Sequence, residues 1–142
     1  MAITSAVCNS FKQEILVGTH DFTAGTGDTF KVALYLSTAN LDAATTIYTV
    51  TGETSGAGYS AGGGVLTSVT PALDGNSAVC DFGDIAFNNA TITARGCLIY
   101  NSTKANRAVC VVNFGSDQIS TGGNFTLVFP DPTSSQAIIR LS

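Results

Sequence analysis

Residues Phe30 to Gly64 read FKVALYLSTANLDAATTIYTVTGETSGAGYSAGGG, and this stretch decides the fold. It begins with alternating side chains, the pattern of a strand that buries one face. Val32, Leu34 and Leu36 alternate with Lys31, Ala33 and Tyr35. The stretch then passes through small residues into a run of glycines. Because glycine has no Cβ, this run predicts a wide loop whose backbone closely approaches another surface, with Tyr59 at its tip.

The rest of the chain predicts further short strands, separated by turn signals every eight to twelve residues or so. This spacing is typical of an all-β sandwich or barrel. We expect a single-domain β-sandwich over residues 1–142, jelly-roll-like, with one short N-terminal helix. The candidate strands are Phe30–Ser37, Ile47–Thr51, Val65–Val69, Ser77–Phe82, Thr91–Ala94, Cys97–Asn101, Ala108–Phe114, Asn124–Phe129 and Ala137–Leu141. The expected connections lie at Pro71, Asp74-Gly75-Asn76, Gly83-Asp84, Thr121-Gly122-Gly123 and Pro130-Asp131-Pro132.

The expected helix runs from Phe11 to Val17. Ser10 and Gln13 match a capping box, and Gly18 follows as a C-terminal stop. On this helix Phe11, Ile15 and Leu16 would share the buried face, while residues 12–14 stay polar. A strand is the alternative, because residues 11, 13, 15 and 17 also fit alternate spacing.

The clearest hairpin joins Cys97–Asn101 to Ala108–Phe114 through residues 102–107. Both faces of its second strand are apolar. This pattern predicts a central strand covered on both sides, or a strand covered by a neighbouring subunit. Lys104 and Arg107 at the tip are expected either in a solvated turn or paired with a carboxylate of a neighbour.

Charged residues make up 11% of the chain, against about 25% in an ordinary globular domain, and the net charge is −4. The surface must therefore consist largely of small and hydroxyl-bearing residues. Such a surface suits either a Thr-rich β domain or a subunit packed against neighbours, and we favour the subunit, as a homotrimer. The scattered basic residues offer no patch for nucleic acid. No apolar run approaches the roughly 20 residues of a membrane span, and the N-terminus lacks the pattern of a signal peptide.

The four cysteines, Cys8, Cys80, Cys97 and Cys110, form no C-x-x-C pair. Cys80, Cys97 and Cys110 lie in apolar strand patterns, where a free cysteine acts as a small hydrophobe. We expect them to be reduced and buried in a protein made in cytoplasm.

The sequence offers little catalytic chemistry. His20, the only histidine, precedes Asp21 in what looks like a polar turn, in which Asp21 would bond its own downstream backbone. Asp81 and Asp84 are close in sequence, but they flank a turn glycine rather than a cleft. The glycine run lacks the Lys and the following helix of a phosphate loop. We therefore predict no enzyme activity and no catalytic, cofactor-binding or metal-binding residue.

The stretch from Cys8 to Gly64, with CNSFKQEILVGTHDFTAGTGDTF leading into the strand and the Gly-Tyr-x-x-Gly-Gly run near its end, resembles a family of small virion proteins of tailed bacteriophages. The resemblance implies a structural protein of the virion, made in the cytoplasm of a bacterial host. Its implied role is that of a capsid cement or decoration protein, whose partner is the major capsid protein and which bridges capsomers, often as a trimer. A tail or fibre-junction component is the second virion role. A carbohydrate-binding β-sandwich that recognises host-surface glycans is the competing class.

Two segments are expected at the interface, the loop Ser55–Gly64 and the segment before Ser10. Neither looks able to order itself, and ordering costs roughly 1–2 kcal/mol per residue. Contacts outside the domain would offset that cost. The expected interface residues are Tyr59, Gly58, Ser60, Ile3 and Thr4.

Overall fold

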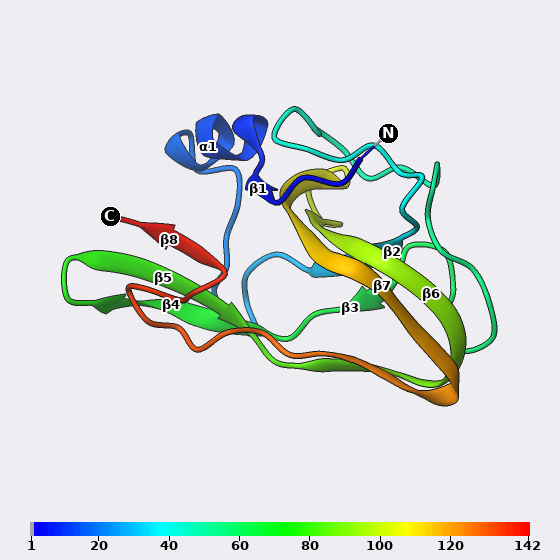
Figure 1. The fold of residues 1–142 in the computed structure, drawn as a ribbon. Helices are drawn as coiled ribbons and strands as arrows, with labels where there is room; N and C mark the ends of the chain where they lie inside the picture. Colours follow the sequence, from blue (N-terminus) through cyan, green and yellow to red (C-terminus); the bar gives the residue numbers. More distant parts are fainter. Residues whose placement is uncertain (1) are drawn as a thin grey trace.

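The computed structural model describes residues 2–142, so Met1, the first residue of the expected N-terminal interface segment, lies outside the described residues. Two antiparallel sheets and one short helix make up the fold, which confirms the expected all-β sandwich (Figure 1). The larger sheet has the strand order β1-β7-β6-β2-β3, and the smaller one has the order β4-β5-β8. The elements are β1 (Ala6–Val7), α1 (Asn9–Leu16), β2 (Phe30–Tyr35), β3 (Gly64–Val65), β4 (Ser68–Asp74), β5 (Ser77–Phe82), β6 (Ile85–Asn101), β7 (Arg107–Leu127) and β8 (Ile139–Leu141).

Aromatic rings join the two sheets. Phe30 of β2 lies with its ring centroid 4.3 Å from that of Phe22 and 5.8 Å from that of Phe82 in β5. All three side chains are buried. Each therefore removes a large apolar area from water at the place where the sheets meet.

The β6–β7 hairpin is the largest feature, and it bends sharply at its middle (Figure 1). The four strands expected in these regions are parts of two long ones: Thr91–Ala94 and Cys97–Asn101 belong to β6, while Ala108–Phe114 and most of Asn124–Phe129 belong to β7. The expected connection at residues 121–123 is wrong, because these residues lie inside β7. Register shifts near Ala90 and a positive φ at Gly122 let the strands bend without ending.

The central-strand interpretation of Ala108–Phe114 is confirmed. β7 lies between β1 and β6, and the side chains of residues 108–111 are buried. Helix α1 also packs against this strand. The chain itself therefore covers residues 108–111 of β7 on both faces.

Helix α1 starts earlier than expected. Cys8 is its N-cap residue and no side chain caps it, so the predicted capping box at Ser10 is wrong. The Gly18 stop is confirmed: the Gly18 N–H donates to the Ile15 carbonyl at 3.2 Å, and the Thr19 N–H donates to the Glu14 carbonyl at 3.0 Å. The strand alternative is wrong.

The buried face of α1 differs from the expected one. Phe11 is buried, but Leu16 is 86% exposed, and Glu14 is buried in its place. The hydrophobic pattern failed here because Glu14 finds charged and polar partners inside the fold, as described below.

Several other strand boundaries differ. Ser77–Phe82 forms β5 as predicted, whereas Ile47–Thr51 contributes only an isolated bridge from Ile47 to Arg107. Val65–Val69 divides between β3 and β4, and Pro71 lies within β4 rather than in a turn. Proline is tolerated there because β4 is an edge strand with a bulge between Val69 and Ala72. The last expected strand shortens to β8.

The cysteines are free thiols. Cys97 and Cys110 are buried as expected, and so is Cys8, while Cys80 is half-buried. Burial raises the pKa of the Cys97 thiol to about 12. These side chains behave as parts of the apolar packing.

Candidate functional site

A single carboxylate, Glu53, organises the glycine-rich segment of residues 52–64. Its Oε1 accepts hydrogen bonds from the Tyr59 hydroxyl at 2.6 Å and from the Gly62 N–H at 2.8 Å. Its Oε2 accepts one from the Tyr48 hydroxyl at 2.6 Å. The Tyr59 oxygen in turn accepts the Leu34 N–H of β2 at 2.9 Å. Charge-assisted hydrogen bonds of this kind are the strong ones, so the loop is fastened to the sheet.

The glycines let this segment lie directly on the chain's own strands. A Cβ at Gly63 would overlap the Val32 carbonyl of β2, and one at Gly56 would overlap the Thr91 carbonyl of β6. The close approach predicted for this run is therefore confirmed, and the surface approached is β2 and β6. The reason given for expecting outside contacts, that the loop cannot order itself, is wrong.

The expected interface residues fall into two groups. Ile3 is only 5% exposed and bridges to Leu41, and the Tyr59 ring packs 5.3 Å from that of Phe87, so both side chains serve the chain's own core. Thr4, Gly58 and Ser60 are exposed. An interface role for the five residues stays a prediction. The three exposed residues have the most surface available for contact with another protein.

All four tyrosines gather around Glu53, although they are scattered in the sequence. The Tyr48 and Tyr100 rings stack 4.8 Å apart, the Tyr100 hydroxyl donates to the Gly62 carbonyl, and the Tyr35 hydroxyl donates to the Thr49 carbonyl. Tyr35 and Tyr100 are almost fully buried. Burial and the Glu53 charge raise the pKa of Tyr100 to about 12. This is a packed polar core rather than an exposed aromatic platform for a sugar.

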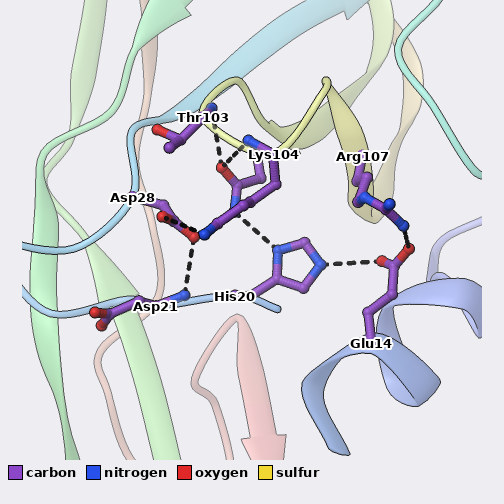
Figure 2. Close-up of polar contacts among 8 residues, drawn as sticks. Glu14, His20, Asp21, Asp28, Thr103, Lys104 and Arg107 are labelled. Carbon is purple, nitrogen blue, oxygen red and sulfur yellow. Dashed lines mark hydrogen bonds and ion pairs between the residues drawn. The ribbon is translucent and has the colours of Figure 1, made fainter. Parts of the chain in front are cut away.

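A second polar network centres on His20 (Figure 2). The imidazole Nε2 lies 3.0 Å from Glu14 Oε1 of α1, and Arg107 at the start of β7 donates to Glu14 Oε2 at 2.6 Å. Burial alone would raise the pKa of Glu14, but the hydrogen bonds from His20 and Arg107 outweigh it and hold the pKa below its ordinary value.

The other side of the ring faces Asn101, the last residue of β6. Asn101 Oδ1 accepts the Thr103 and Lys104 N–H groups, so its Nδ2 must point the other way, to His20 Nδ1 at 2.9 Å and Asp28 Oδ2 at 2.8 Å. His20 Nδ1 is therefore the acceptor, and the Nε2–H donates to Glu14. Burial opposes ionisation of Asp28, but the bonds from Asn101 and the Asp21 N–H, with Lys104 nearby, lower its pKa.

This network joins α1, the loop after it, and the adjacent ends of β6 and β7. The His20 side chain is 0% exposed and both ring nitrogens are engaged, so the ring lies out of reach of an external ligand. The polar turn expected after the helix exists, since Asp21 Oδ1 accepts the Thr23 N–H at 2.9 Å, but the histidine itself belongs to the core. Lys104 and Arg107, expected in a solvated turn or against a neighbour, face Asp28 and Glu14 of their own chain.

Sequence reasoning missed one motif. Residues Gly58 to Gly62 spell G-x-S-x-G, the pattern of a hydrolase nucleophile elbow around Ser60. That elbow is a strand–turn–helix junction whose serine bonds a histidine. Here Ser60 lies in a loop that leads into β3, and within residues 2–142 no basic side chain bonds its hydroxyl. The motif is part of the packed glycine segment.

Residues 2–142 contain no group of three or more His, Cys, Asp or Glu side chains arranged to hold a metal ion. No helix in the described part of the chain has the length and apolar character that a membrane crossing needs. Comparison of the chain with family models, with curated proteins and with solved structures found no match.

Proposed function

We propose that the chain is a non-enzymatic structural protein of a tailed-bacteriophage virion that binds the outside of the head and bridges capsomers. The observation that carries this proposal is the resemblance of residues 8–64 to small virion proteins, stated above. The Gly-Tyr-x-x-Gly-Gly run within it has a structural task in this fold. Its tyrosine donates to Glu53 and its glycines lie on β6 and β2, so the run supports a scaffold rather than a reaction.

The surface supports the same proposal. Large aliphatic side chains stand in solvent on several elements, among them Val65 of β3, Leu73 of β4 and Ile119 of β7. With only 11% charged residues, few charges oppose contact with a neighbouring protein. A small domain that touches several capsid subunits stabilises them through the added binding energy across their seams.

Copy number on the particle tests the proposal. Quantitative mass spectrometry of purified virions should find the chain at hundreds of copies, lost from the head when shells are stripped and regained when the purified chain is added back. A dozen copies or fewer would instead support a tail or fibre-junction component. Absence from virions, together with specific and saturable binding on a glycan array, would replace the proposal with the carbohydrate-binding alternative.

A further inference from the structure

An apolar groove separates the C-terminal end of α1 from the smaller sheet. It has a volume of about 420 Å³, and its lining includes Ile15, Phe22, Pro71, Ala78, Cys80 and Leu141. In Figure 1 the end of α1 lies above β8, at the side of the molecule away from the bend of the β6–β7 hairpin.

Exposed aliphatic side chains border this groove. Leu16 and Val17 are 86% and 67% exposed, and they lie between Ile15 and Gly18, which both line it. On the sheet side, Leu73 and Leu141 flank Ala78 in register and are 78% and 54% exposed. Directly opposed residues share one face of a sheet, so these leucines extend the apolar surface of the groove.

The same patch carries charges of opposite sign. Lys12 is exposed and lies one helical turn before Leu16, so the two side chains share a face of α1. Asp21 is exposed and lies among the groove residues. A second copy that inserts its Leu16 into this groove would bring its Lys12 toward Asp21.

We propose that the occupant of the groove is a second copy of this chain, with the Leu16–Val17 corner of each copy inserted into the groove of the other. The protruding Leu16–Val17 corner and the groove lie side by side on one surface patch. A two-fold contact uses the same patch on both copies, so it needs a patch that is complementary to itself in this way. The Lys12–Asp21 pairing then occurs twice. A pair of copies differs from the trimer expected from the sequence, and it does not depend on the proposed virion role.

Sedimentation velocity between about 1 µM and 1 mM protein tests the pair, because weak contacts dissociate within that range. The wild-type chain should pass from monomer to dimer. Val17→Asp should weaken the dimer by about tenfold or more, since it places a charge in the apolar contact. Val50→Asp is the matched control: Val50 is 64% exposed and does not line the groove, and the dimer dissociation constant of this variant should stay within about twofold of wild type.

A charge exchange separates self-association from capture of a foreign protein. Lys12→Glu and Asp21→Lys should each weaken the dimer alone, and an equimolar mixture of the two variant chains should recover it. Circular dichroism spectra that match wild type show that each variant folds. Three results would overturn the pair: a monomer throughout the range, equal effects of Val17→Asp and Val50→Asp, or a trimeric mass. Because this experiment uses the isolated chain, its failure leaves the virion test untouched.

Discussion

At the scale of single residues, Gly63 of the 52–64 segment and Gly122 of β7 differ in why a side chain would be unfavourable. Gly63 and Gly122 both have positive φ, but only at Gly63 would a Cβ strike backbone atoms, those of Val32 and Ala33. Gly122→Ala should therefore cost about 1 kcal/mol of unfolding free energy, the cost of the left-handed conformation. Gly63→Ala should cost several times more, or prevent folding. Urea denaturation of both variants measures the difference, and equal costs would contradict the packing described.

Tyr59 gives a second prediction, because its contacts lie within its own chain. If the loop were ordered by a partner, Tyr59→Ala would leave the isolated fold nearly intact. Its hydroxyl instead donates to Glu53 and accepts from Leu34, and its ring packs on Phe87. Tyr59→Phe should lower the unfolding free energy by about 1–3 kcal/mol, because the Glu53 carboxylate loses one of its three donors and the Leu34 N–H loses its acceptor. Tyr59→Ala should lower it further. Chemical denaturation gives both values, and an unchanged Phe variant would show that the hydroxyl contributes nothing.

At the scale of elements, the His20 network ties α1, the loop after it and the tip of the β6–β7 hairpin. The pKa values of Glu14 and Asp28 are lowered in the folded state. Their stabilising contribution is therefore complete above their unfolded pKa values, about 4, and is lost as the pH falls toward the folded values. We expect the unfolding free energy to decrease steadily below about pH 5.

Glu14→Gln tests this dependence. At pH 7 it should cost about 1.5–3 kcal/mol, because the charged partner of Arg107 and His20 is removed. As the pH falls from about 4 toward the lowered folded pKa of Glu14, the variant and wild type should converge, and they should meet only below that folded pKa, where Glu14 is protonated in both states of the wild type. Asp131→Asn, at an exposed carboxylate, serves as the control and should track wild type throughout. Parallel wild-type and Glu14→Gln profiles down to pH 2 would contradict the assignment.

The elements also mark how far the sequence could predict the fold. β2, β5 and the 102–106 turn followed from local patterns, because alternation and turn residues act over a few positions. The length of β6 and β7 did not, since glycine and asparagine mark bulges and turns alike. The sequence places Glu14 in the helix and Asn101 at the end of a strand, but it does not predict that both side chains are buried or which partners they bind. Their partners lie up to 93 positions away, and only the folded chain brings them together.

At the scale of the whole molecule, the aromatic cluster of Phe22, Phe30 and Phe82 joins the two sheets into one cooperative unit. Cys8, Cys97 and Cys110 are buried near one another in the larger sheet, Cys8 directly after β1 and the other two on β6 and β7, and burial raises the pKa of each thiol, that of Cys8 to about 11. Near pH 8 about one Cys8 thiol in a thousand is then ionised, so thiol reagents should label the native chain slowly. We expect these three cysteines to react with a thiol reagent at one common rate, set by global unfolding and rising together with urea. Cys80 is half-buried and should react faster.

Peptide mapping of the labelled chain under non-reducing conditions measures the extent of labelling at each cysteine. A disulfide among them, or a faster rate at Cys8 alone, would contradict a single cooperative core closed by β1 and α1.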